Sequence, residues 1–176
     1  MLRGMPLFEF EGAAPKVDPT AWIAPTATLV GDVTVEANAS VWYGVVVRAD
    51  FGPIVIRAGA NIQDNSVLHG GPDGTEIGVG ATVGHLCVVH GCTVGEQALV
   101  GNGATVQDGA KIGARALVAA GATVTPGMEI PPETVAMGSP AKRQVPLDGQ
   151  AKVWVDHNPE IYQDLARRHA RSVKPA

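Results

Sequence analysis

The feature that most constrains the fold is a six-residue periodicity of aliphatic residues that runs through most of the chain. From Ile23 an aliphatic residue recurs at every sixth position, and the pattern resumes after interruptions at residues 51–53 and 70–74. After a shift of one residue, it continues through Val94, Val100, Val106, Ile112, Val118, Val124 and Ile130. Because self-similarity at a fixed period indicates a stacked repeat architecture, the chain is predicted to build one repetitive structure.

Each six-residue unit is interpreted as one face of a prism, with three units in each coil. An aliphatic side chain points inward, and a small residue four positions later, such as Ala98 or Ala104, completes the interior. The 22 glycines among 176 residues suit such a fold, because tight corners need residues that adopt positive φ angles. A β-sandwich would show alternation with period two instead. We therefore expect an all-β parallel β-helix with its N-terminal lead-in over residues 1–145.

A helical segment is expected after the repeats, over residues 146–176, packed on the β-helix. Asn158 is interpreted as an N-cap and Pro159 as the first helical residue, a position that proline favours. Ile161, Leu165 and Ala166 then form one apolar stripe. These features predict a helix over residues 159–171.

Composition excludes several classes of function. The net charge is −4 and basic residues do not form a face, which disfavours nucleic-acid binding. No apolar run approaches the ~18 residues that a membrane span needs. Cys87 and Cys92 are too few for a disulfide framework and are expected to fill the core of a protein in a reducing compartment. A cytoplasmic location is therefore expected.

Two sets of polar residues share a spacing of 21 residues. One set is Arg48, His69 and His90, and the other is Tyr43, Asp64 and His85, with Asn102 continuing the second set. Two insertions of three residues lengthen the coil repeat from 18 to 21 in this region. Each set is therefore expected to stack as one column, the second on the face that precedes the first.

The three histidines favour a metal site. Neutral imidazole is a common zinc ligand, and three histidines with one open position form a known catalytic arrangement. His69 and His90 can share a metal within one chain, whereas His85 points from a neighbouring face. The third ligand is then most easily provided by another subunit, which predicts a cyclic trimer with three identical sites.

At these residues the chain resembles the γ-class carbonic anhydrases. The resemblance is carried by residues 41–44, 48–50, 61–64, 68–69, 84–85 and 89–92, and residues 138–142 resemble the segment that closes the β-helix in that family. It implies a left-handed parallel β-helix of hexapeptide repeats with a C-terminal α-helix, a homotrimer, and reversible hydration of CO₂ to bicarbonate. The implied metal is Zn²⁺, with Fe²⁺ or Co²⁺ as alternatives.

The resemblance also assigns roles to individual residues. It implies that His69, His85 and His90 are metal ligands. Gln63 would orient the metal-bound hydroxide, Asn61 would lie beside it, and Tyr162 matches a tyrosine of the family's terminal helix. Arg48, Asp50 and Asp64 would join adjacent subunits and hold the ligands in place.

The chain departs from the family pattern where protons are thought to be transferred. Phe51 replaces a glutamate, and the short stretch Gly70-Gly71-Pro72 replaces a longer acidic loop, which is typical of a shorter subclass. Asp73 and Glu76 are the nearby acidic residues that could substitute. Slow or absent CO₂ hydration with an intact metal site is therefore one expectation.

Three alternative functions remain open from the sequence. One is a metal-dependent thioesterase or other hydrolase that uses the same site. Another is a hexapeptide acyltransferase, which would favour one catalytic histidine and a groove for the acyl donor. The last is a non-catalytic scaffold that uses the metal only to assemble.

Overall fold

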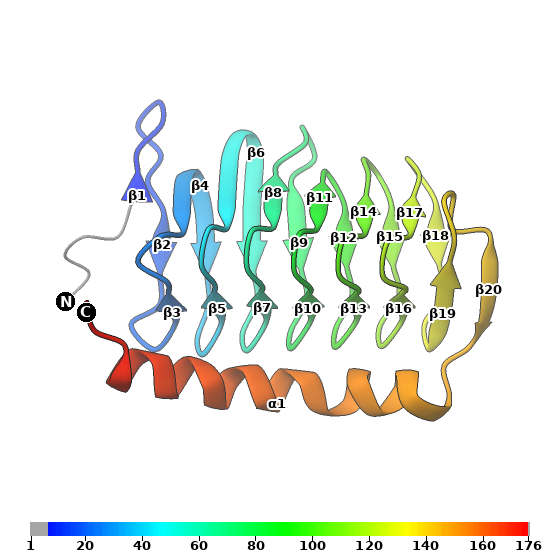
Figure 1. Ribbon diagram of the computed structural model, residues 1–176. Coiled ribbons are helices and arrows are strands. Elements are labelled where there is room, and N and C mark those ends of the chain that lie inside the picture. Colours follow the sequence, from blue (N-terminus) through cyan, green and yellow to red (C-terminus); the bar gives the residue numbers. More distant parts are fainter. Residues whose placement is uncertain (1–6, 176) are drawn as a thin grey trace.

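The computed structural model describes residues 7–175. Stacked coils form a three-sided prism, and one long helix lies along one side of it (Figure 1). One sheet forms the side that the helix covers. Its strands are β3 (Trp22–Ile23), β5 (Ser40–Val41), β7 (Asn61–Ile62), β10 (Thr82–Val83), β13 (Leu99–Val100), β16 (Leu117–Val118), β19 (Thr134–Met137) and β20 (Arg143–Pro146). All of them pair in parallel except β19 and β20, which pair antiparallel.

A second sheet forms the other two sides. One side contains β8 (Val67–His69), β11 (Val88–His90), β14 (Thr105–Val106) and β17 (Thr123–Val124), and the other contains β9 (Thr75–Ile77), β12 (Thr93–Val94), β15 (Lys111–Ile112) and β18 (Glu129–Ile130). The sides are joined by the long strand β6 (Val46–Ile56), which pairs with both β8 and β9. The remaining strands are β1 (Leu7–Phe8), β2 (Lys16–Val17) and β4 (Thr28–Val35).

The predicted inward positions form the core of the prism. The aliphatic residues of the six-residue repeat are buried, and so are the alanines predicted at the second inward position. In neighbouring coils these side chains lie directly above one another, as shown by the pairing of Leu68 with Val89 and of Val94 with Ile112. The parallel β-helix and its hexapeptide register are therefore confirmed.

Corners of the prism place many residues in the left-handed backbone region. Gly44, Asn65, Leu86 and Gly103 stack at one corner, with φ angles of +68°, +58°, +57° and +68°. Glycine and asparagine tolerate this conformation, whereas a leucine there is strained. Leu86 is nevertheless 65% exposed, so burial within its own chain does not offset the strain.

The helix α1 (Gly149–Ser172) begins at Gly149, so the predicted start at Pro159 is wrong. Asp148 is the N-cap, and Pro159 lies inside the helix, where a proline removes a backbone hydrogen bond and costs ~3 kcal/mol. Packing on the prism offsets this cost, because Val155, Pro159 and Ala166 are buried there. Local sequence signals identified the helix, and tertiary contacts extended it toward its N-terminus. No helix within residues 7–175 is long and apolar enough to cross a membrane.

Replacing one inward residue tests the core. We expect Ile77→Ala to lower the free energy of unfolding by ~2–5 kcal/mol, because Ile77 is fully buried and the truncation leaves a cavity. Urea unfolding at a fixed protein concentration measures the change. Val79→Ala is the control, since Val79 is exposed and should change stability by less than ~0.5 kcal/mol. Equal losses in the two variants would contradict the predicted inward register.

Candidate functional site

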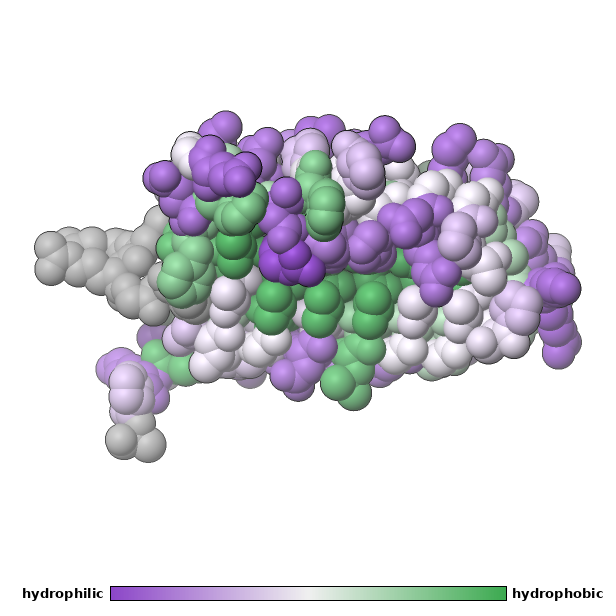
Figure 2. Space-filling view, turned by 90° about the horizontal axis from the view of Figure 1, so that it is seen from above, coloured by the Kyte–Doolittle hydropathy of each residue, from purple (hydrophilic) through white to green (hydrophobic). Residues whose placement is uncertain are grey.

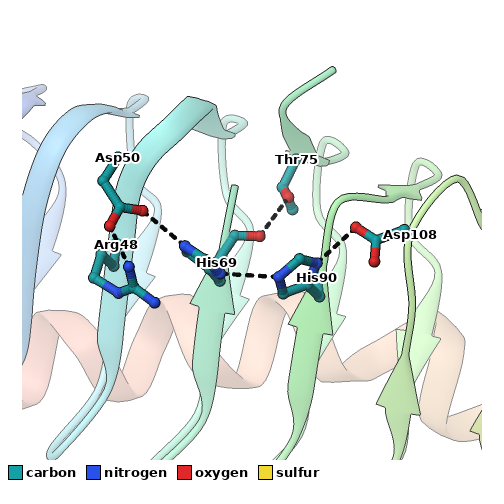
Figure 3. A network of polar contacts seen from close by, with 6 residues as sticks. All are labelled: Arg48, Asp50, His69, Thr75, His90 and Asp108. Carbon is teal, nitrogen blue, oxygen red and sulfur yellow. Dashed lines mark hydrogen bonds and ion pairs between the residues drawn. The ribbon is translucent and has the colours of Figure 1, made fainter. Parts of the chain in front are cut away.

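A chain of polar contacts crosses the coils on the side formed by β6, β8 and β11 (Figure 3). Arg48 pairs with Asp50, and Asp50 Oδ1 lies 2.7 Å from His69 Nε2. His69 Nδ1 lies 2.9 Å from His90 Nε2, and His90 Nδ1 lies 2.7 Å from Asp108 Oδ1. The two imidazoles therefore meet at one nitrogen each, and a carboxylate holds the other nitrogen of each ring.

The strand register creates this arrangement. Arg48 is the Cα partner of His69, and His69 is the Cα partner of His90, so the 21-residue spacing produces one column. Each residue of the column follows a buried aliphatic side chain, which anchors the strand and points the polar side chain outward. His69 is the better shielded of the two histidines, with 14% of its side chain exposed against 36% for His90.

Asp50 is electrostatically suited to hold His69. The His69 imidazole beside it, with Arg48 adding to the effect, keeps the pKa of the Asp50 carboxyl below its ordinary value. Asp50 is therefore ionised at neutral pH and accepts a hydrogen bond from the ring. This contact fixes the ring orientation and leaves the opposite nitrogen facing His90.

The second column lies at a corner of the prism, which corrects the expectation that it stands on a face. Asp64 and His85 are both in turns, and Asp64 Oδ2 lies 2.9 Å from His85 Nδ1. The His85 backbone N–H donates to Asn102 Oδ1 at 3.0 Å, so Asn102 continues the column as expected. Tyr43 turns away, and its hydroxyl lies 2.9 Å from His169 Nδ1 on α1.

Tyr162 extends from α1 to the same corner. Its hydroxyl lies 3.4 Å from His85 Nε2. Burial, followed by the negative charge of Asp64, raises the pKa of the Tyr162 phenol above its ordinary value. Tyr162 is therefore protonated at neutral pH and can donate a hydrogen bond beside His85.

Asn61 and Gln63 belong to a buried amide network. Gln63 Nε2 donates to Asn61 Oδ1 at 3.0 Å, and Asn61 Nδ2 donates to Thr82 Oγ1 at 2.8 Å. From the helix, Asn158 Nδ2 also donates to Thr82 Oγ1 at 3.2 Å. Because each side chain is held by the next, Gln63 has a fixed orientation.

Sequence reasoning missed three members of these networks. The 17-residue register between β11 and β14 places Gln107, not Asp108, opposite His90, so column counting stops one position short of Asp108. Thr82 and Asn158 gave no signal either. They meet because the helix packs on the prism, and Asn158 was interpreted as a cap instead.

The acidic residues proposed to replace the missing glutamates differ in their contacts. Glu76 accepts a hydrogen bond from Arg57 at 2.9 Å and is therefore held on the side that contains β9. Asp73 is exposed in the turn before β9. Phe51 is 72% exposed, and its ring centroid lies 5.8 Å from that of His69. An aromatic ring thus borders His69 where the family pattern places a carboxylate.

Both cysteines are buried, as expected for core residues. Burial raises the pKa of the Cys92 thiol to about 12, and it also raises the pKa of Cys87. Neither is a thiolate at neutral pH, which is the form that binds metals.

The donor set within one chain is incomplete as a metal centre. No group of three His, Cys, Asp or Glu side chains within residues 7–175 is arranged to hold a metal ion. His69 and His90 nevertheless form a pair of imidazoles, each bound to a carboxylate, which is the arrangement that orients metal-binding histidines. The chain therefore contains a pair of suitable ligands that needs at least one further donor.

Comparison with known proteins gives relatives over most of the chain. Residues 91–126 match the family described as "Bacterial transferase hexapeptide (six repeats)". The chain is 40% identical to γ carbonic anhydrase 2, mitochondrial, of Arabidopsis thaliana over 164 residues, covering 89% of this chain and 59% of that protein. It thus spans about three fifths of the length of this plant relative. It is also 38% identical to the carnitine operon protein CaiE of Escherichia coli K12, covering 93% of this chain and 84% of that protein.

Solved structures agree with the fold over the same length. A hexapeptide transferase family protein from Anaplasma phagocytophilum superimposes with a TM-score of 0.90 at 38% identity, covering 96% of this chain and 99% of that chain. A Bacillus cereus protein described as a putative acetyltransferase gives a TM-score of 0.89 at 32% identity, covering 93% and 95%. From these relatives and its own repeat geometry, we conclude that the chain belongs to the hexapeptide-repeat family of left-handed parallel β-helix proteins that includes the γ-class carbonic anhydrases and CaiE.

Proposed function

We propose that the protein is a metal-dependent carbonic anhydrase of the γ type, which interconverts CO₂ and bicarbonate at the interfaces of a homotrimer. The observation that carries the proposal is the contact between His69 and His90, with Asp50 and Asp108 on their outer nitrogens. The relationship to γ carbonic anhydrases supports the same reading.

The proposed ligands are His69 and His90 of one subunit and His85 of its neighbour. His85 lies at a corner, where Asp64 holds its Nδ1 atom. Each of the three imidazoles thus has a carboxylate partner. Such a partner makes the ring a stronger metal ligand and fixes its orientation. A Zn²⁺ ion bound to three such rings would act as a Lewis acid and make water ionise near neutral pH, an effect for which carbonic anhydrase is the standard example.

Other residues of this chain would complete the site. Gln63, whose amide is fixed by Asn61 and Thr82, would hold the reacting oxygen by a hydrogen bond. Tyr162 would donate beside His85. Arg48, Asp50 and Asp64 would contribute charged hydrogen bonds between subunits, in addition to the contacts that they make within the chain.

The surface around the histidines supports the proposal that subunits assemble at this site. Val67 and Val88 pair across neighbouring coils and are 39% and 42% exposed, beside the histidine column. Figure 2 shows a short row of apolar side chains bordered by hydrophilic ones on the face opposite the helix. Exposed apolar groups bordered by polar residues are typical of an interface. A strained and exposed leucine at residue 86, beside His85, is best explained by contact with a second copy.

Metal content tests the ligand assignment. We expect about one transition metal per chain in protein purified without chelators or a histidine tag, because three subunits form three sites. His69→Ala, His85→Ala and His90→Ala should each remove most of the metal, since two ligands rarely retain zinc. His157→Ala is the control, because His157 is exposed on α1. Mass spectrometry of the metal measures the result, and less than one metal for every three wild-type chains would overturn the assignment.

Activity of the metal-loaded protein tests the reaction. CO₂ hydration by the wild-type protein is expected, and Gln63→Leu should lower its rate about tenfold to hundredfold because one hydrogen bond to a charged group is lost. Gln144→Leu, on the exposed strand β20, should not change the rate. Stopped-flow measurement with a pH indicator gives both values. Activity toward acyl-CoA without any CO₂ hydration would contradict the proposal.

Assembly has its own test at Leu86. Leu86→Asn is expected to shift the trimer toward monomers, because it removes an exposed apolar side chain while asparagine accepts the same backbone conformation. Analytical ultracentrifugation over a range of concentrations measures the shift. Val79→Asn, at a different corner of the prism, should leave the trimer intact. An unchanged Leu86→Asn trimer would show that this corner is not an interface.

A further inference from the structure

All three phenylalanines of the chain lie on the surface, near one end of the histidine column. Phe8, Phe10 and Phe51 are 52%, 40% and 72% exposed. Phe8 pairs with Val30, and Val30 pairs with Arg48, so Phe8 lies in the same column as the histidines. Phenylalanine is among the residues that proteins bury most often. Three exposed rings in one region therefore indicate a surface that a partner covers.

Strand pairing and packing hold these rings in place. Residues 7–13, here called the N-terminal hairpin, fold back so that Phe10 and Ala13 exchange backbone hydrogen bonds of 2.9 and 3.0 Å. Phe10 packs closely on Gly31, where an added Cβ atom would lie 3.6 Å from the phenylalanine Cβ. The hairpin begins in β1, which pairs with β4, and β4 pairs with β6, the strand that contains Phe51. The surface is thus part of the prism.

Charges of opposite sign lie at this end of the molecule, on different sides of it. Glu9 and Glu11 of the N-terminal hairpin are exposed, and so are Arg168 and Arg171 near the end of α1. Arg168 Nη1 lies 4.0 Å from Asp164 Oδ2, at the limit of an ion pair. The hairpin and the last turns of α1 are at the same end of the prism but on opposite sides (Figure 1). The two sets of charges therefore do not meet within one chain.

One edge of α1 borders the corner that contains His85. Tyr162 reaches His85 from this edge, and Trp154 and His85 line one groove between the helix and the sheet. Trp154, Ile161 and Arg168 are spaced by seven residues, or two helical turns, so they share this edge, here called the exposed edge. Trp154 and Ile161 are 56% and 52% exposed. The exposed edge is therefore apolar along most of its length and basic near its end.

The proposed metal site determines how neighbouring subunits align. His85 and His90 belong to one coil, so a metal ion that joins them between subunits keeps equivalent coils at one height. The face with the histidine column then lies beside the neighbour's exposed edge. The helix runs opposite to the coils, because His169 contacts Tyr43 whereas Tyr162 contacts His85 in a later coil. The last turns of the neighbour's helix are therefore level with the first coils, where the N-terminal hairpin lies.

We propose that the N-terminal hairpin and Phe51 of one subunit bind the exposed edge of α1 in the next subunit. The acidic residues of the hairpin pair with the basic end of that helix, and Phe51 packs on its apolar part. The occupant is a second copy of this chain, because a second copy presents the opposite charge at the same height. This inference rests on the proposed trimer and adds a contact outside the metal ligands.

Charge reversal tests the contact. Isotope-labelled and unlabelled trimers are mixed, and native mass spectrometry follows the exchange of subunits. Glu9→Lys/Glu11→Lys and Arg168→Glu/Arg171→Glu should each exchange at least about tenfold faster at low salt, because like charges then face one another at three contacts per trimer. A chain with all four substitutions should return toward the wild-type rate. At about 1 M NaCl the differences should largely disappear, because salt screens exposed charges.

Two further variants separate the contact from a general effect of surface changes. Phe51→Ser should also speed exchange, and this effect should persist in high salt because the lost contact is apolar. Glu160→Lys is the matched control for charge reversal, because Glu160 is exposed on α1 away from the exposed edge. It should exchange at the wild-type rate. Recovery in the four-substitution chain excludes unfolding as the cause of faster exchange.

Two results would overturn the inference alone. They are wild-type exchange rates in both charge variants, and a four-substitution chain that exchanges as fast as the charge variants. Each can occur in a trimer that retains its metal and hydrates CO₂, so it leaves the proposed function intact. A metal-loaded wild-type protein that is monomeric at all concentrations would instead overturn both proposals.

Discussion

Parallel stacking of the coils is the constraint on which the rest of the structure depends. Each inward aliphatic side chain packs against its equivalents in the coils above and below, as Leu68 does against Val89, and the backbone hydrogen bonds follow the same register. A slip of one residue would turn every inward side chain outward, so the register is strongly determined. The same register places His69 directly beside His90. Core packing and the candidate site thus have one physical cause.

Carboxylate contacts then orient the histidines of this column as candidate metal ligands. Stacked imidazoles alone would be two weakly oriented rings, but Asp50 and Asp108 hold the outer nitrogen of each. His85 has an equivalent partner in Asp64 at the corner. The three histidines are not brought together within the described residues of one chain. This division between a face and a corner is the geometry that a ring of subunits would complete.

The helix α1 adds polar contacts and an apolar groove to one side of the prism. It packs on the sheet through Val155, Pro159 and Ala166, and it brings Tyr162 to His85 and Asn158 to Thr82. Where its first turns pass over β13 to β19, they leave an apolar groove that opens at the same histidine. One corner of the molecule therefore contains the Asp64–His85 pair and borders a groove that is lined by no Asp, Glu, Lys or Arg side chain. The family relatives described as carbonic anhydrases and as putative acetyltransferases share the scaffold that makes this possible.

The sequence by itself determined the parallel β-helix, its register and the column that contains Arg48, His69 and His90, because a fixed period converts positions in the chain directly into positions in space. The period did not identify Asp108, because Asp108 lies one position beyond Gln107, the residue that the register places opposite His90. Only the tertiary structure decided the start of α1, the corner position of His85, the network that holds Gln63, and the groove. These depend on packing between segments far apart in the chain, which no local period encodes. At Pro159 the packing even reversed a local signal, since buried contacts outweighed the preference of proline for the start of a helix.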